Sequence, residues 1–133
     1  MVKLTYKFEN QVNANEVADV FKSSGIRRPV HDLGRINRMF TYSNLIVSAR
    51  DNGKLVGIAR ALTDFSYCCY LSDLAVRKEY QRQGVGRELI RRVQQAIGQE
   101  TMLLLLSAAE ADGYYPHIGF EKVNNAWQTS RKR

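Results

Sequence analysis

One stretch of the chain, residues 70–92, constrains the fold more than any other. It opens with apolar, β-compatible residues, Tyr70–Val76, which predict a strand. A basic segment with Gly84 and Gly86 follows, and from Arg87 onward the apolar residues recur at helical spacing. The first backbone N–H groups of a helix lack partners within it, and glycine lets an anion approach the backbone closely. The stretch therefore predicts a phosphate-binding turn between a strand and a helix.

The spacing of the glycines excludes two common phosphate-binding motifs. A dinucleotide-binding G-x-G-x-x-G motif would need a third glycine where Leu89 stands, and the lysine and hydroxyl residue of a Walker A loop do not follow. The pattern that fits is QRQGVG at residues 81–86, a Q/R-x-x-G-x-G/A motif directly after the strand. It resembles the acetyl-CoA signature of the GNAT N-acetyltransferase superfamily. A glycine-rich turn that holds no ligand is the alternative interpretation.

Length and composition indicate one globular domain. The chain has 133 residues, of which 44% are hydrophobic and 25% charged, which is enough for a real core. No apolar run approaches the ~18 residues of a membrane span, so we expect residues 1–133 to form a single domain without membrane contact. With only two cysteines and no metal-ligand spacing, we expect a reducing, cytoplasmic location. The adjacent Cys68 and Cys69 would point to opposite faces of a strand, so we expect no disulfide between them. We find no metal-ligand spacing and expect no metal.

The order of predicted elements is that of a mixed sheet flanked by helices, in the α/β (α+β) class. Helices are predicted from the cap Asn13 to Gly25, after the cap Asp32, from residue 87 to residue 98, and at residues 109–115. Strands are predicted at residues 3–9, 45–50, 54–63, 67–76 and 101–107, with two closing strands at 120–124 and 127–130. The continuous apolar run at residues 103–106 predicts a central strand that is buried on both faces.

A second motif strengthens the resemblance. Residues 111–120, ADGYYPHIGF, are similar to the A-x-x-φ-Y-x-x-x-G-F segment of the GNAT superfamily, and Tyr115 lies 34 residues after Gln81. The hairpin at residues 51–57 also resembles that of the family. The chain is therefore identified as a member of this superfamily, with good coverage of residues 45–120 and agreement only in topology before them. The implied fold is a mixed, mostly antiparallel sheet with splayed central strands flanked by helices.

The resemblance implies a site for acetyl-CoA as the acetyl donor. The pantetheine arm would pair with the strand that ends at Val76, and a backbone N–H near that residue would stabilise the developing oxyanion. The pyrophosphate would lie on the backbone N–H groups of residues 82–87. Tyr115 corresponds to the residue that protonates, or donates a hydrogen bond to, the departing thiolate. The implied cofactor-binding residues are Leu74, Ala75, Val76, Gln81, Arg82, Gln83, Gly84, Val85, Gly86 and Arg87.

The chain departs from the family pattern at one position. Many members carry an asparagine where Ala108 stands, and its side chain bonds the cofactor arm. That hydrogen bond is missing here, or is replaced by Ser107 or by the backbone.

The general base and the acceptor pocket remain open at this stage. We expect Asp73 as the base, on a face that depends on an unseen bulge, and Arg28 and His31 as acceptor-binding residues. Arg27 and Arg35 belong to the same predicted border of the pocket. The other candidates for the base are Asp64, Glu79, His31 and Glu110.

These observations predict an N-acetyltransferase that moves an acetyl group to a primary amine by direct attack in a ternary complex. A small amine is the expected acceptor. The alternatives are a protein or aminoacyl-tRNA amine, or a noncatalytic module that binds acyl-CoA or nucleic acid. The net charge of +7, and six basic against two acidic residues at positions 77–92, leave a nucleic-acid partner open without favouring it. A homodimer is also left open.

Overall fold

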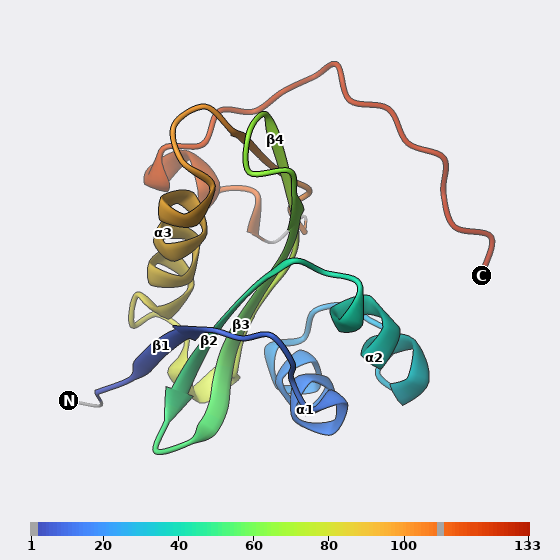
Figure 1. The fold of residues 1–133 in the computed structure, drawn as a ribbon, viewed down its shortest axis with the longest axis vertical. Coiled ribbons are helices and arrows are strands. Elements are labelled where there is room, and N and C mark those ends of the chain that lie inside the picture. Colours follow the sequence, from blue (N-terminus) through green and yellow to red (C-terminus); the bar gives the residue numbers. More distant parts are fainter. Residues whose placement is uncertain (1–2, 109–110) are drawn as a thin grey trace.

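The computed structural model describes residues 3–108 and 111–133 and contains one five-stranded sheet in the order β1-β2-β3-β4-β5 (Figure 1). β1 to β4 pair in antiparallel fashion, and β4 and β5 pair in parallel. Helices α1 and α2 cover one face of the sheet and α3 the other, which confirms the predicted fold class. The bounds are β1 Thr5–Phe8, α1 Ala14–Ser24, α2 Leu33–Thr41, β2 Leu45–Asp51, β3 Lys54–Thr63, β4 Cys68–Val76, η1 Lys78–Tyr80, α3 Val85–Ile97, β5 Met102–Leu105 and η3 Tyr115–Ile118. In the described part of the chain, no helix has both the length and the apolar character to cross a membrane.

The first two helices begin at the predicted caps. The side chain of Asn13 accepts hydrogen bonds from the N–H groups of Asn15 and Glu16, and Asp32 accepts one from the N–H of Arg35. Each cap satisfies donors that a helix leaves unpaired in its first turn. The two caps thereby fix where α1 and α2 begin.

The sheet has a separate apolar core on each face. Val17, Phe21 and Ile36 from α1 and α2 pack on one face, while Leu89 and Val93 of α3 pack on the other. β3 is the middle strand of the five and contributes buried side chains to both cores.

Gly57 of β3 lets α3 lie close to the sheet. A Cβ at this position would lie 3.2 Å from side-chain carbons of both Leu89 and Val85. We therefore expect Gly57→Ala to lower the free energy of unfolding by about 1–3 kcal/mol, because α3 must shift to admit the methyl group. Urea denaturation measures this change. Gly34→Ala in α2 is the control, since the nearest atoms lie 3.7 Å away and helix propensity favours alanine. Equal effects of the two substitutions would contradict the expectation.

The C-terminal part of the chain differs from the predicted fold. The two closing strands at residues 120–124 and 127–130 do not form, and residues 121–133 are extended, exposed coil. The prediction that residues 103–106 lie in a central strand was wrong, because β5 pairs only with β4 among the described residues and lies at the edge. Met102 is consequently 58% exposed and Leu106 61%. The predicted helix at 109–115 begins outside the described residues, and its remainder forms turns before η3.

Candidate active site

A β-bulge in β4 separates two halves of the strand that face opposite ways. The register with β3 pairs Arg60 with Asp73 but Ala61 with Leu71, so Ser72 has no partner in it. Before the bulge, Leu71 belongs to the core beneath α3. After it, Ala75 belongs to the core beneath α1 and α2. The extra residue reverses the alternation of side chains, as a bulge does, and turns Asp73 toward α1 and α2.

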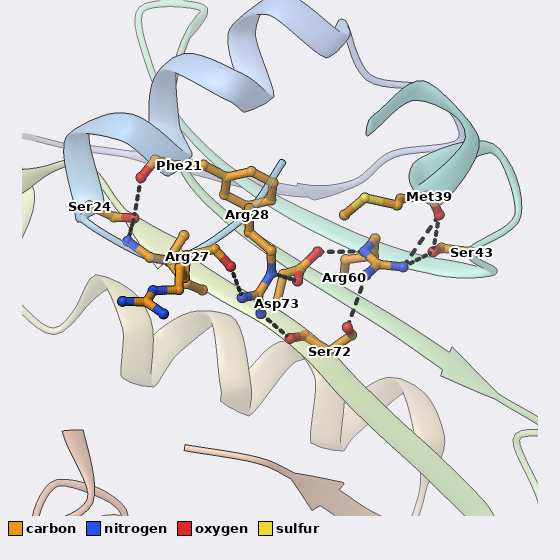
Figure 2. Close-up of polar contacts among 10 residues, drawn as sticks. Phe21, Ser24, Arg27, Arg28, Met39, Ser43, Arg60, Ser72 and Asp73 are labelled. Atoms are coloured by element: carbon orange, nitrogen blue, oxygen red, sulfur yellow. Dashed lines mark hydrogen bonds and ion pairs between the residues drawn. The ribbon is translucent and has the colours of Figure 1, made fainter. Parts of the chain in front are cut away.

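Two arginines hold this bulge from opposite sides (Figure 2). Asp73 is fully buried, and its two carboxylate oxygens accept hydrogen bonds from Nε of Arg28 and Nε of Arg60, each at 2.5 Å. Arg28 also donates to the carbonyl of Ser72 at 2.7 Å, and Arg60 to the hydroxyl of Ser72 at 2.9 Å. Arg60 reaches further to the hydroxyl of Ser43, just after α2. We call Arg28, Arg60, Ser72 and Asp73 the bulge cluster.

β4 and β5 part directly at the bulge. Their parallel pairing runs from Cys68 with Met102 to Leu71 with Leu105 and then ends, while β4 continues to Val76. β3 still pairs with residues 74–76 on one side. The other backbone edge of these three residues has no strand partner in the part of the chain that the structure describes. This arrangement confirms the predicted splay, which separates β4 from the edge strand β5.

The glycine turn follows this free edge and opens at the N-terminus of α3. Gly84 is the N-cap residue, with φ of +83°, and no side chain caps the helix there. The first bond of the helix runs from the N–H of Glu88 to the carbonyl of Gly84, so three earlier N–H groups precede the helical pattern. The side chain of Gln81 donates to the carbonyl of Val76 at 2.9 Å and thereby ties the turn to the strand.

The two sequence motifs meet at Gly86. A Cβ built on Gly86 would lie 3.8 Å from the hydroxyl oxygen of Tyr114 and 3.9 Å from methyl carbons of Leu74 and Val76. Tyr115, the next residue, is half-buried, and its ring packs edge-on against Phe120 with centroids 5.5 Å apart. The glycine turn, the end of β4 and the second motif therefore converge on one place.

Burial sets the protonation state of Tyr115. The pKa of its hydroxyl is raised above the ordinary value of 10.0, chiefly by burial and to a smaller degree by neighbouring Tyr114. The hydroxyl is therefore protonated at neutral pH and can donate a hydrogen bond.

Residues 16–130 match the family model described as an acetyltransferase (GNAT) domain. The chain belongs to the GNAT acetyltransferase family. It is accordingly an acyltransferase.

Related sequences agree with this assignment to the GNAT family. The chain is 25% identical over 124 residues to an uncharacterized N-acetyltransferase, ycf52, of Gracilaria tenuistipitata var. liui. The aligned region covers 90% of this chain and 68% of that protein. It is 33% identical over 70 residues to the chloroplastic GCN5-related N-acetyltransferase 2 of Arabidopsis thaliana, and the aligned region covers 51% of this chain. This chain spans only 27% of that plant protein.

Solved structures share the GNAT fold at low identity. The GNAT family acetyltransferase SP0256 of Streptococcus pneumoniae has a TM-score of 0.74 at 22% identity, over 97% of this chain and 100% of that chain. The aminoglycoside N-acetyltransferase AAC(6')-Iy, solved in complex with CoA, has a TM-score of 0.74 at 15% identity, over 100% of this chain and 97% of that chain.

Of the other candidates for the general base, the structure ties one to a turn and leaves two at the surface. The carboxylate of Asp64 accepts bonds from the N–H groups of Tyr67, Ser66 and Cys68, which lower its pKa to about 2 and tie it to the turn before β4. His31 and Glu79 are exposed, the first on the loop before α2 and the second in η1. Glu110 lies outside the described residues.

Sequence reasoning missed Arg60 as a partner of Asp73. The signal was present, because Arg60 is the one charge inside the otherwise apolar run of residues 55–62. A charged residue in a buried strand needs an opposite charge or a set of hydrogen-bond acceptors. The sequence pattern of the strand does not show which carboxylate would pair with Arg60.

Proposed function

We propose that this GNAT chain transfers the acetyl group of acetyl-CoA to a primary amine by direct attack in a ternary complex. The observation that carries the proposal is the convergence at Gly86, where an open helix N-terminus, the free edge of β4 and the Tyr114–Tyr115 segment meet. A thioester at this place would have anion donors, a strand edge and a protonated phenol around it. The CoA-bound acetyltransferase of the same fold supports this choice of donor.

The donor is proposed to lie along β4 and end on the glycine turn. Backbone groups of residues 74–76 would pair with its extended arm, in the manner of an added strand. The N–H groups of residues 82–87, at the start of α3, would bind the pyrophosphate, because the positive end of the helix dipole lies there and attracts an anion. The exposed side chains of Arg82 and Arg87 would add charge beside them.

The chemistry needs no nucleophile from the protein. Acetyl-CoA would supply the activated thioester, and the amine would form the new bond to its carbonyl carbon as the bond to sulfur breaks. A backbone N–H near Val76 is proposed to stabilise the negative charge on the carbonyl oxygen. Tyr115 is proposed to donate a hydrogen bond to the departing sulfur. Full proton transfer is less favourable, since a thiolate is a weaker base than tyrosinate by about 1.5 pKa units.

Asp73 is proposed to position β4 and not to accept the proton of the amine. Both of its oxygens accept short bonds from guanidinium groups, and its side chain is fully buried. A general base must present a lone pair to the proton that it removes. For an alkyl amine with a pKa of about 10.4, loss of the proton before attack costs about 4.6 kcal/mol at pH 7. We propose that solvent accepts this proton.

Arg28 keeps part of its capacity to bind an acceptor. Three of its N–H groups bond Asp73, Ser72 and the carbonyl of Arg27, and a guanidinium group has five. The remaining donors are proposed to bind a carboxylate on a small amine acceptor. His31, exposed on the same loop, is proposed to border that acceptor.

Calorimetry with acetyl-CoA, CoA and ATP tests the donor site. Binding of both CoA species without binding of ATP is the expected result, and a screen of small amines for thiol release then identifies the acceptor. A folded protein that binds neither CoA species would overturn the proposal.

Tyr115→Phe is expected to lower kcat by about a hundredfold while leaving the affinity for acetyl-CoA nearly unchanged. The substitution keeps the ring that packs on Phe120 and removes only the hydroxyl. Thiol release under saturating substrates measures kcat, and calorimetry measures the affinity. Tyr42→Phe is the matched control, because Tyr42 is exposed at the end of α2, and it should leave kcat nearly unchanged. Equal kcat in the wild type and Tyr115→Phe would remove Tyr115 from the mechanism.

The pH dependence of kcat/KM should follow the acceptor. With an alkyl amine, kcat/KM is expected to rise about tenfold per unit between pH 7 and pH 9, because the free-base fraction rises in that proportion below a pKa of about 10.4. Tyr115 does not limit this range, because its raised pKa keeps the hydroxyl protonated. A plateau near pH 7 would instead reveal a general base in the protein.

A further inference from the structure

The segment that joins β4 to α3 leads into the glycine turn and is bonded to the domain on both sides. The N–H of Arg77 donates to the carbonyl of Val56 at 2.8 Å, and its Nε donates to the carbonyl of Leu55 at 2.7 Å. The N–H of Lys78 donates to the hydroxyl of Ser23 in α1 at 2.9 Å. The first residues of the segment are therefore fixed between the start of β3 and the end of α1.

Tyr80 ties the middle of this segment to the β2–β3 hairpin. Its hydroxyl donates to Oδ2 of Asp51, the last residue of β2, at 2.5 Å, and its ring packs against the core beneath α3. The bond to Asp51 raises the pKa of the hydroxyl above the ordinary value of 10.0, so the hydroxyl is protonated and donates at neutral pH. In the part of the chain that the structure describes, this is the one hydrogen bond that the segment makes between two side chains.

The glycine turn is strained two residues after Tyr80. Arg82 adopts a φ of +64°, in the left-handed region that residues other than glycine seldom occupy. Such a conformation persists only where the surrounding structure holds it. α3 begins directly after Gly84 and holds the turn from its C-terminal side. The side-chain bonds of Tyr80 and Gln81 hold it from the N-terminal side, and only that of Tyr80 reaches another hairpin.

We propose that the hydrogen bond from Tyr80 to Asp51 positions the glycine turn to bind the pyrophosphate of the donor. This inference rests on the proposed function, because the donor is the ligand whose affinity it concerns. Without the bond, the strained turn relaxes, and binding must then order it again. A site that is ordered before it binds loses less conformational freedom on binding, so its affinity is higher. Tyr80 and Asp51 are positioning residues that act on the donor through the turn.

Tyr80→Phe tests the inference, because it keeps the ring on the core and removes only the hydroxyl. By calorimetry, the variant is expected to bind CoA about tenfold more weakly than the wild type does. Displacement of a fluorescent CoA conjugate should show an unchanged affinity for pantetheine, which lacks the pyrophosphate. Urea denaturation gives the folded fraction of each variant, so that every Kd refers to folded protein.

Thr101→Val is the matched control for the loss of a hydroxyl bond. The hydroxyl of Thr101 donates to the carbonyl of Ile97 at 2.8 Å, at the opposite end of α3 from the glycine turn. The substitution keeps the shape of the side chain and removes that donor. The affinity for CoA should equal that of the wild type, because the turn keeps all of its bonds.

Asp51 allows a rescue experiment. Asp51→Ala removes the acceptor and should weaken CoA binding as much as Tyr80→Phe does. The double variant should bind no more weakly than either single variant, because both remove the same bond. Asp51→Asn keeps an acceptor oxygen and should recover most of the affinity.

The outcomes separate this inference from the proposed function. If Tyr80→Phe binds CoA with the Kd of the wild type, or loses affinity for CoA and pantetheine alike, the positioning role is wrong and the donor site stands. Additive losses in the double variant would also contradict it, since the two side chains would then act separately. A folded wild type that binds no CoA overturns both the inference and the proposed function.

Discussion

Gly84→Glu is expected to abolish measurable acetyl-CoA binding while the domain stays folded. Gly84 has φ of +83° and no heavy atom within 4 Å of its built Cβ, so the glutamate side chain enters open space at the start of α3. Its carboxylate would occupy the region where the pyrophosphate is proposed to lie, and it would repel that anion. The same carboxylate interacts favourably with the helix dipole, so the fold is not expected to suffer from the charge.

The control for this experiment is Gly53→Glu in the β2–β3 hairpin. Gly53 has φ of +88° and also has open space around its built Cβ, so both variants bear a similar backbone strain of about 1–2 kcal/mol. Calorimetry should then separate them, since only the substitution at Gly84 removes binding. If Gly84→Glu binds acetyl-CoA as tightly as Gly53→Glu does, the glycine turn is not the phosphate site.

The features that could be predicted from the sequence are those that depend on a few neighbouring residues. The Asn52-Gly53 pair predicts a tight hairpin, and both residues adopt positive φ, 50° and 88°. Asn13 and Asp32 predict caps because their side chains need only the next turn of the chain. The glycine turn was predictable on the same grounds, since Gly84 adopts the left-handed conformation that ends one element and starts the next.

The bulge could not be located from the sequence. Apolar residues in β4 stand at odd and even positions alike, from Cys68 to Leu71 before the bulge and from Leu74 to Val76 after it. An inserted residue shows in a sequence only as a change of phase in a regular alternation of apolar and polar residues, and this strand has no such alternation. The structure locates the extra residue at Ser72 and shows that Arg28 and Arg60 fill the space around it.

The edge position of β5 could not be predicted by the same route. An apolar run such as residues 103–106 indicates burial only if strands lie on both sides, and that depends on whether the distant residues 120–130 form strands beside it. Residues 120–130 have a strand-like pattern, yet a strand needs a partner edge as well as a pattern.

Arg60→Ala is expected to cost roughly 3–5 kcal/mol of folding stability, a larger loss than for the other arginine of the bulge cluster. Arg60 is almost fully buried and shares the carboxylate of Asp73, so its removal leaves a buried charge with one partner fewer. Arg28→Ala should cost less, about 1–2 kcal/mol, because its side chain is 26% exposed and water can replace it. Urea denaturation measures both losses.

The same series separates the contribution of the cluster to folding stability from a role of Arg28 in acceptor binding. Arg91→Ala is the control, since Arg91 is 51% exposed and its pair with Glu88 contributes at most about 1 kcal/mol. A loss for Arg60→Ala no larger than for Arg91→Ala would mean that the cluster does not stabilise the fold. Arg28→Ala retains enough stability for kinetics, and it should raise the KM of the acceptor while leaving acetyl-CoA binding unchanged. If its acceptor KM equals that of the wild type, Arg28 acts only on the bulge, because the bonds to Asp73 and Ser72 then account for the whole of its contribution.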